Sequence, residues 1–287
     1  MNWKTVVEAI DYDKAQEIIT SFIRQYVEET GVRGVVAGVS GGVDSTVAAA
    51  LAAKALGPER VLGLFMPSVY TPPEDWRDVQ EVSSALGIRL KTVEITPIVE
   101  SFAKTIPDFS PEDKMARGNL MARVRMSILY YYANRDNLLV LGTSDRSEIL
   151  LGYFTKYGDG GVDILPLAPL YKVQVREMAM RLGFGNVVQK PSSPRFWSGH
   201  TAEGELGASY EEIDPVLFAL FDKRLTVEET RKIFGEIVDM VVRRVEKNSH
   251  KRGPPPSPDL SGARRDRALI VSHQADNNAA SGGSLGG

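Results

Sequence analysis

Residues 35–46 have the sequence Val35-Val36-Ala37-Gly38-Val39-Ser40-Gly41-Gly42-Val43-Asp44-Ser45-Thr46, and this stretch decides the fold. It begins as a buried strand, and the alanine-rich run after Asp44 predicts a helix that continues to Leu56. Gly41 and Gly42 permit positive φ angles and place no Cβ in the path of an approaching anion. The first N–H groups and the dipole of the helix point into the same space. The stretch therefore predicts a phosphate-binding turn between a strand and a helix.

This turn differs from the common phosphate loop G-x-x-x-x-G-K-[ST], in which a lysine follows the last glycine. Here Val43 and Asp44 follow it, so an aspartate stands at the start of the helix. A carboxylate in that place favours a phosphate bridged by magnesium over a phosphate bound by lysine. The alternative is that Asp44 only caps the helix and that the glycines only form a tight turn.

The composition is that of an ordinary globular protein, and it excludes several kinds of chemistry. Of 287 residues, 43% are hydrophobic and 25% are charged, and the net charge of -3 provides no overall basic surface for nucleic acid. No apolar run reaches the ~20 residues of a membrane helix, and the N-terminus lacks a signal-peptide pattern, so we expect a cytoplasmic protein without a membrane partner. The absence of cysteine excludes disulfides, thiolate metal sites and a cysteine nucleophile, and three histidines argue against a histidine-rich metal site.

Predicted strands and helices alternate along the first half of the chain. Short apolar runs predict further strands at residues 61–66, 90–95 and 138–141. Helical periodicity is present at residues 14–29, 72–87, 115–135, 172–182, 226–234 and 236–246. This alternation predicts an α/β fold, doubly wound, with a mostly parallel sheet and helices on both faces. We expect one domain over residues 1–256 and, because of its glycine, serine and asparagine content, a disordered tail over residues 257–287.

Three segments outside the predicted strands are candidates for a ligand site. Ligands of α/β sheets bind beyond the carboxyl ends of the strands, so residues 142–148 should face the same crevice as residues 40–45. Glu148 would then meet Asp44 across a metal–phosphate group, although it could equally complement a helix dipole. Residues 152–163 are too rich in glycine, aromatic and charged residues for a core element. Residues 191–207 predict a mobile, lid-like loop.

Two arginines in the predicted helix at residues 115–135 have alternative interpretations. Arg123 and Arg125 lie two residues apart, so their side chains point in different directions. Either could bind a phosphate of a ligand, or both could belong to an ordinary solvated helix face.

The motif Ser40-Gly41-Gly42-Val43-Asp44-Ser45 matches the SGGxDS signature, so the chain resembles the ATP pyrophosphatases of the PP-loop family. That resemblance implies an adenine nucleotide α-hydrolase-like fold that cleaves ATP between its α and β phosphates and transfers AMP to a substrate oxygen. A narrower resemblance, to ammonia-dependent NAD synthetases of archaeal type, rests on residues 142–148, 152–163 and Leu170-Tyr171-Lys172. It spans about residues 13–256 and is supported by Asn119 with residues 122–126, by Glu205-Leu206-Gly207 with Tyr210, and by His250-Lys251-Arg252.

The narrower resemblance implies a carbon–nitrogen ligase of NAD biosynthesis. Such an enzyme amidates deamido-NAD (nicotinate adenine dinucleotide) to NAD with ammonia and ATP, through an acyl-adenylate, and releases AMP and pyrophosphate. The resemblance also implies a Mg2+ cofactor, a homodimer and, since the chain has no cysteine, ammonia that is free or released by a separate protein.

The same resemblance assigns site residues by their positions in the matching motifs. Magnesium would be held by Asp44 and Glu148, and the residues with catalytic roles would be Asp44, Lys156, Asp163 and Lys172. ATP would be bound by Gly38, Ser40, Gly41, Gly42, Val43, Asp44, Ser45, Arg125, Thr143, Lys172 and Thr201. Deamido-NAD would be bound by Arg123, Phe154, Thr155, Lys156, Asp159, Asp163, His250 and Lys251.

One segment departs from the family pattern. The family tends to have Gly-Gln-Thr-Asp-Glu where this chain has Gly199-His200-Thr201-Ala202-Glu203, which leaves the contacts of the lid and the role of Thr201 open. Two other functions also remain: another PP-loop ATP pyrophosphatase that modifies tRNA or forms a different amide, and a non-catalytic nucleotide-binding regulator.

Overall fold

The computed structural model describes residues 1–261 of the chain. Residues 1–252 form one compact unit. The tail expected at residues 257–287 falls, from residue 262 onward, outside the described residues. Within the described part of the chain, no helix combines the length and the hydropathy that crossing a membrane requires.

A four-stranded sheet forms the centre of this unit, and its strands are ordered β3-β2-β1-β4. The strands are β1 Gly34–Gly38, β2 Val61–Phe65, β3 Arg89–Thr92 and β4 Leu138–Leu141, and all three pairings are parallel. The chain moves from β1 to one side for β2 and β3 and then returns to the other side for β4. Such a reversal opens a crevice at the carboxyl ends of β1 and β4. The predicted α/β fold with a parallel sheet is confirmed.

Helices make up most of the remaining structure. In chain order they are α1 Trp3–Val7, α2 Tyr12–Thr30, α3 Val43–Leu56, η1 Pro58–Arg60, α4 Pro73–Leu86, α5 Thr96–Thr105, α6 Lys114–Asp136, α7 Arg146–Leu151, α8 Lys172–Arg181, α9 Gly185–Val188, α10 Ala202–Leu206, α11 Tyr210–Phe221, α12 Val227–Phe234, α13 Ile237–Lys247 and η2 Ser249–Lys251.

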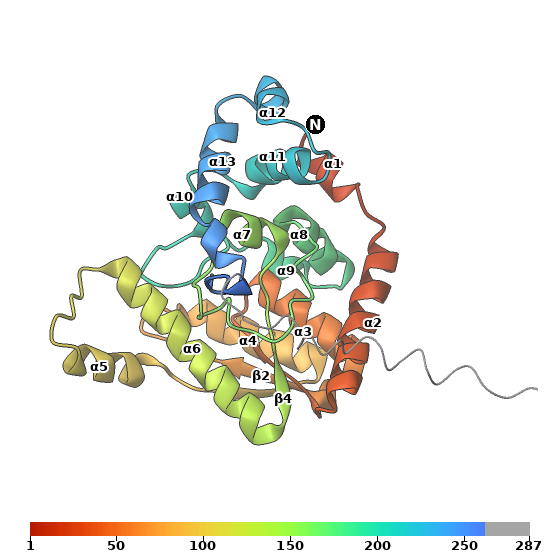
Figure 1. Cartoon of the computed structure of the whole chain (residues 1–287). Helices are drawn as coiled ribbons and strands as arrows, with labels where there is room; N and C mark the ends of the chain where they lie inside the picture. The colour runs from red at the N-terminus through yellow and green to blue at the C-terminus, as the bar shows by residue number, and fades with distance from the viewer. Residues whose placement is uncertain (262–287) are drawn as a thin grey trace, which may run out of the picture. The chain divides into compact units, whose positions relative to one another are not determined.

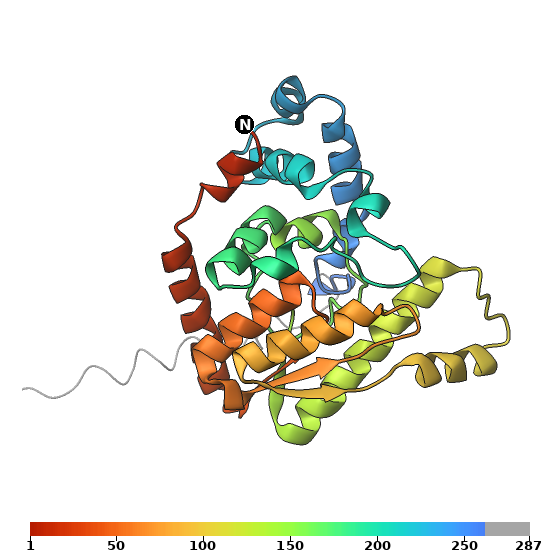
Figure 2. The same ribbon diagram turned by 180° about the vertical axis from the view of Figure 1, so that it is seen from behind.

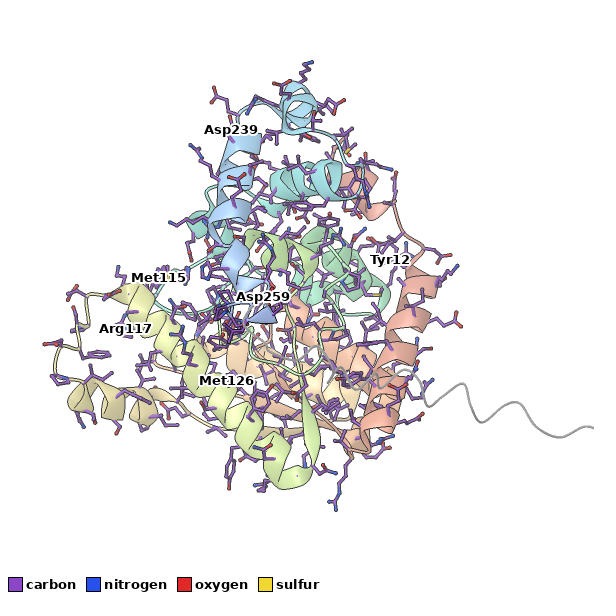
Figure 3. All side chains as sticks on the ribbon, viewed as in Figure 1. Tyr12, Met115, Arg117, Met126, Asp239 and Asp259 are labelled. Carbon is purple, nitrogen blue, oxygen red and sulfur yellow. The ribbon has the colours of Figure 1, made fainter. Side chains whose placement is uncertain are left out.

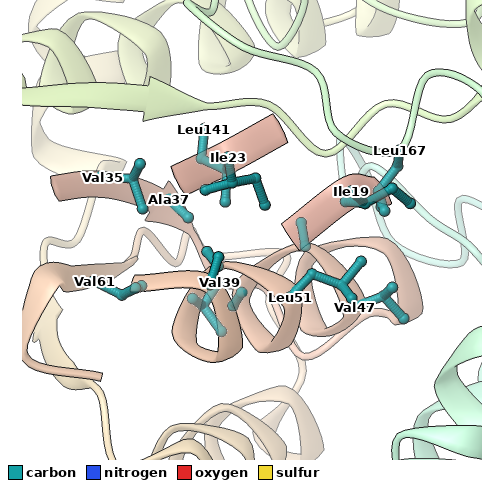
Figure 4. Packing of buried hydrophobic residues seen from close by; sticks show 14 of the residues in the cluster. Ile19, Ile23, Val35, Ala37, Val39, Val47, Leu51, Val61, Leu141 and Leu167 are labelled. Atoms are coloured by element: carbon teal, nitrogen blue, oxygen red, sulfur yellow. The ribbon is translucent and has the colours of Figure 1, made fainter. Parts of the chain in front are cut away.

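Both faces of the sheet are covered, as Figures 1 and 2 show from opposite sides. Val35 and Ala37 of β1 face a core shared with α2 and α3 (Figure 4), whereas Val36 faces a second core shared with α6. This alternation follows from the two-residue period of a strand. α3 is buried on nearly all sides. Its many alanines suit that place, because small side chains let α3 pack closely against both the sheet and α2.

A third hydrophobic core joins α7 and the start of α8 to α10, α11 and α13, which gather in the upper part of Figure 1. α11 carries a capping box in which Ser209 and Glu212 bond reciprocally, and most of its side chains are buried. The sequence patterns did not predict α5 or α11. Residues 191–207, which were expected to form a loop, contain α10. α7 and α8 connect this third core to the crevice at the sheet.

Candidate active site

The turn of residues 40–45, which we call the phosphate turn, joins β1 to α3. Gly41 has a φ of 76°, in the left-handed region that favours glycine, but Gly42 has a φ of -87° and serves as the N-cap of α3. The expectation of positive φ is therefore correct for Gly41 and wrong for Gly42. Two serines brace the turn: Ser40 N donates to Ser45 Oγ at 3.2 Å, and Gly42 N donates to Ser40 Oγ at 3.3 Å.

The start of α3 is arranged to receive an anion. Its N-cap, Gly42, has no side chain to accept hydrogen bonds from the first turn of the helix. The N–H groups and the helix dipole there favour negative charge. Asp44 lies inside the helix and is not its N-cap, so the alternative in which Asp44 only caps α3 is wrong.

Asp44 belongs to a cluster of three carboxylates around one ammonium group. Lys172, the first residue of α8, is fully buried, and its Nζ lies 2.6 Å from Asp44 Oδ2, 3.1 Å from Asp145 Oδ2 and 3.1 Å from Glu148 Oε1. Asp145 is the N-cap of α7 and forms a capping box with Glu148. Glu148 therefore supports the helix start and pairs with the same ammonium group as Asp44, whereas its predicted role at a metal stays a prediction.

Burial governs the electrostatics of this cluster. Desolvation raises the pKa of Asp145 to about 6 and raises the pKa of Glu148 well above its ordinary value. Burial alone would lower the pKa of Lys172, but the carboxylates of Asp145, Asp44 and Glu148 outweigh it and hold that pKa well above its ordinary value. If all three carboxylates were ionised, they would exceed the charge of one ammonium, and a divalent cation would stabilise that ionised form.

The donor atoms of the cluster suit magnesium. Asp44 Oδ1 is buried and has no hydrogen-bond partner, so one oxygen next to the phosphate turn is left to bind something else. Magnesium is usually held by one or two carboxylates together with phosphate oxygens of the substrate. Within residues 1–261 no group of three His, Cys, Asp or Glu side chains is arranged around a metal position. Asp44 and Glu148 fit the two-carboxylate arrangement.

A cavity of about 280 Å³ opens beside the phosphate turn. Nine of the residues predicted to bind ATP line it, namely Gly38, Ser40, Gly41, Gly42, Val43, Asp44, Ser45, Arg125 and Thr143. Arg125 is half-buried there and donates from Nε to Met66 O at 3.0 Å, and desolvation lowers its pKa to about 10. The solvated-face alternative is therefore wrong for Arg125. Lys172, which lies behind Asp44, and Thr201, the N-cap of α10, do not line the cavity.

A second cavity, of about 530 Å³, adjoins the first. Of the residues predicted to bind deamido-NAD, Phe154, Thr155, Asp159 and Lys251 line it. Lys251 Nζ donates to Gly152 O and Phe154 O, which fixes the segment that carries Phe154. The two cavities share Tyr153, Asp159, Pro194 and Phe196. A ligand in one cavity can thus meet a ligand in the other.

Four of the residues predicted to bind deamido-NAD lie outside both cavities. Arg123 is exposed and donates to Lys156 O, and Lys156 Nζ donates to the backbone oxygen of His250. The carboxylate of Asp163 accepts from Tyr130 Oη at 3.0 Å and from Val140 N at 2.7 Å, which ties it to the edge of β4. None of these four residues lines the first or the second cavity.

The structure also reveals residues that the sequence did not single out. Arg243, Arg244 and Lys247 of α13 make the second cavity basic, and Lys190 and Arg195 line the first. The α13 residues have a periodic helical pattern but no motif. Lys190 directly precedes residues 191–207, which were predicted only as a lid-like loop, and Arg195 lies within them.

Lys172 is held in place by a buried network that no sequence signal indicates. Its backbone N donates to Ser147 Oγ at 2.9 Å, and Ser147 Oγ donates to Asp214 Oδ1 at 2.6 Å. Asp214 Oδ2 also accepts from Val173 N at 2.9 Å. Burial raises the pKa of Asp214 to about 8. Asp214, from α11, thereby fixes the first turn of α8 and with it the direction of the Lys172 side chain.

Comparisons with known proteins agree on one family. The family described as NAD synthase matches residues 15–255. An NH3-dependent NAD+ synthetase from Pyrobaculum aerophilum is 64% identical over 261 residues, which cover 91% of this chain and 98% of that protein. A protein of the same name from Hyperthermus butylicus is 52% identical over 255 residues, which cover 87% of this chain and 92% of that protein.

Solved structures give the same result for the fold. An NMN synthetase from Francisella tularensis is 32% identical with a TM-score of 0.77, covering 87% of this chain and 99% of its own. An NH3-dependent NAD synthetase from Campylobacter jejuni, in complex with nitrate, is 32% identical with a TM-score of 0.75 and coverages of 87% and 100%.

Proposed function

The chain belongs to the NAD synthase family, as its motifs led us to expect, and we propose that it amidates deamido-NAD to NAD with ammonia and ATP. The reaction is that of a carbon–nitrogen ligase and releases AMP and pyrophosphate. One observation carries the proposal: the phosphate turn and the Asp44–Lys172 cluster share a crevice with a second, basic cavity.

The chemistry explains why two cavities must meet. A carboxylate reacts poorly with ammonia because its oxygen is a poor leaving group, whereas an acyl-adenylate loses AMP readily. The protein must therefore align the pyridine carboxylate with the α-phosphorus of ATP and keep water away from the intermediate. The phosphate turn would hold the departing pyrophosphate by the N–H groups at the start of α3. Arg125 and Thr143 line the same cavity and would contact the rest of the nucleotide.

We propose that Asp44 and Glu148 hold a magnesium ion. When bound, that ion supplies positive charge against the phosphate oxygens on which negative charge develops. Lys172 remains protonated in this site, because its pKa is held well above the ordinary value. It therefore acts as a fixed positive charge next to Asp44 and not as a proton acceptor.

The second cavity suits the dinucleotide acid. Lys251, Arg243, Arg244 and Lys247 would pair with its two phosphates, and Phe154 offers an aromatic surface. Among the carboxylates of this region, Asp159 lines both cavities, and its Oδ1 accepts from Thr155 N at 2.8 Å. Both oxygens of Asp163 are engaged, by Tyr130 Oη and Val140 N. We therefore place Asp159, in preference to Asp163, next to the incoming ammonia. The roles predicted for Lys156, His250, Arg123 and Thr201 stay predictions.

The expected homodimer has a candidate contact surface on α5 and α6. α5 has no buried residue, and it exposes Ile98, Phe102 and Ile106. Met115 at the start of α6 (Figure 3) and Tyr131 near its end are also exposed, Tyr131 by 61%. Exposed large apolar side chains on neighbouring elements are typical of protein contacts. We propose that a second copy covers this surface. The cytoplasmic location expected from the sequence stays a prediction.

The reaction is tested by incubating the protein with ATP, magnesium, an ammonium salt and deamido-NAD. NAD, AMP and pyrophosphate should form together, and pyrophosphate release should depend on the acid. Nicotinate mononucleotide serves as the comparison acid, because one structural relative is an NMN synthetase. Formation of ADP and phosphate would contradict the adenylation step. ATP binding without turnover would favour the regulator, and a tRNA complex that survives physiological salt would favour the tRNA-modifying enzyme.

A further inference from the structure

Residues 190–201, which we call the lid, connect α9 to α10 and form part of the wall of the first cavity. Lys190, Arg195 and Phe196 line that cavity together with the phosphate turn. The lid has no helix or strand of its own, so its position depends on side-chain contacts with its surroundings. Three such contacts hold it.

The first contact is a buried aspartate in the first turn of α4. Asp75 is only 3% exposed, and both of its oxygens are engaged by cations of the lid. Lys190 Nζ lies 3.0 Å from Asp75 Oδ1, while Arg195 donates from Nε to Oδ2 at 3.0 Å and from Nη2 to Oδ1 at 3.1 Å. Asp78, one turn later, also pairs with Lys190. The paired bonds from Arg195 form a fork, the arrangement that fixes the orientation of both partners.

The backbone at Arg195 shows that this contact holds the lid in a disfavoured conformation. Arg195 has a φ of 54°, in the left-handed backbone region that residues other than glycine and asparagine rarely adopt. Such a conformation persists where the surrounding structure enforces it. Because both oxygens of Asp75 bind the Arg195 guanidinium, Asp75 also stabilises this backbone conformation of Arg195.

The second contact seats Phe196 against α6. A Cβ placed on Gly118 of α6 would lie 2.5 Å from Cγ of Phe196, closer than carbon atoms approach. The ring therefore occupies a notch that only glycine leaves open. The third contact anchors the far end of the lid: His200 Nε2 lies 2.9 Å from Glu205 Oε2, and the Trp197 ring stacks on the His200 ring at 3.6 Å.

From these contacts we propose that Asp75 is a positioning residue for ATP, which it serves by holding the lid closed over the phosphate turn. Its carboxylate would repel a triphosphate if it stood alone, but Lys190 and Arg195 neutralise it. This inference rests on the proposed function, because it assumes that the first cavity takes ATP. Asp75 also lines the first cavity, but both of its oxygens are engaged by Lys190 and Arg195, so we assign it a role through the lid.

Asp75→Asn tests the proposal, because it removes the charge and keeps the shape of the side chain. The KM for ATP should rise about tenfold while kcat changes less than about threefold, the pattern expected when ground-state binding is lost. Trypsin should cut the Arg195–Phe196 bond faster in the nucleotide-free variant than in the wild type. The matched control is Glu74→Gln, which neutralises an exposed carboxylate in the same turn of α4. It should change neither quantity.

Gly118→Ala provides an independent test if Asp75→Asn does not fold. Alanine favours the helix, so the fold should be retained, but its Cβ excludes Phe196 from the notch and should raise the KM for ATP and the cleavage rate. Adding Phe196→Ala should lower both again. Wild-type KM and cleavage rates in Asp75→Asn, or in Gly118→Ala, would overturn the proposal. If the wild type makes no NAD, the proposed function fails, and the cleavage rates still decide whether Asp75 holds the lid.

Discussion

Lys172 Nζ lies 2.6 Å from Asp44 Oδ2, and this ion pair connects the first turn of α3 to the first turn of α8. The phosphate turn has no lysine of its own after Gly42, in contrast to the common phosphate loop. The fold instead supplies Lys172, which is distant in the sequence. Lys172 contacts the phosphate turn through its ion pair with the carboxylate of Asp44. The charge next to the phosphates is therefore set jointly by Lys172, Asp44 and Glu148.

The first prediction concerns the two proposed magnesium ligands. Asp44→Asn and Glu148→Gln should each lower the rate of pyrophosphate release on the order of 100-fold, because the ion that opposes the developing phosphate charge is bound less well. Circular dichroism should show an unchanged fold, since each substitution also relieves repulsion among the carboxylates. Raising the magnesium concentration should restore part of the rate. Wild-type rates at low magnesium would leave Asp44 and Glu148 with structural roles only.

The second prediction concerns the buried ammonium group. Lys172→Met should lower the free energy of unfolding by about 3–5 kcal/mol, because it leaves three carboxylates in a dry site without a cation. Urea denaturation measures the loss. In the double variant Lys172→Met/Glu148→Gln, one of those charges is gone, so part of the stability should return. Equal stability of the single and double variants would show that repulsion among the carboxylates is not the cause.

Local patterns predicted the sheet and its phosphate turn, since strands and helix starts depend on residues close in sequence. The alternation of strands and helices was enough to place residues 142–148 next to residues 40–45. The patterns also showed that Arg123 and Arg125 point in different directions, but they could not tell which of the two side chains faces the cavity. That depends on which face of α6 the sheet covers, and only the packing of Val36, Val124 and Val140 decides it.

The parts that could not be predicted depend on partners far apart in the chain. Nothing near Asp214 indicates that it accepts from Ser147 and Val173, and α11 was missed although its side chains are largely buried. A lid-like loop was predicted at residues 191–207 from its irregular composition. The pairing of Arg195 with Asp75 could not be predicted, because it joins two segments that no sequence motif connects. Such contacts appear only once the sheet has brought the segments together.

The third prediction concerns the apolar surface of α5 and α6. Phe102→Glu should convert a dimer into a monomer in size-exclusion chromatography with light scattering, because it places a charge in a contact that must lose water. The matched control is Glu100→Gln, a substitution on α5 that adds no charge. If the wild type is monomeric at micromolar concentration, the proposed contact is wrong. A dimer that withstands Phe102→Glu must use a different surface.

The fourth prediction concerns the pH dependence of stability. Burial raises the pKa of Asp214 from its ordinary value of 3.8 to about 8, so between these values the folded state holds a proton that the unfolded state has lost. That proton would lie on Oδ1, which would then donate to Ser147 Oγ in place of accepting from it. The folded state binds more protons, and its stability must therefore fall as pH rises through this window, by at most about 1.4 kcal/mol per pH unit from this group.

Asp214→Asn isolates that contribution, because the amide cannot ionise and its oxygen can still accept from Val173 N. Urea denaturation at several pH values should give a shallower decline for the variant between about pH 6 and 8 than for the wild type. A smaller slope should remain below about pH 6, since the pKa of Asp145 is also raised by burial. Parallel curves for the two proteins would mean that Asp214 is ionised in the folded state at neutral pH. Ser147 and Val173 would then be bonding a carboxylate and not a carboxylic acid.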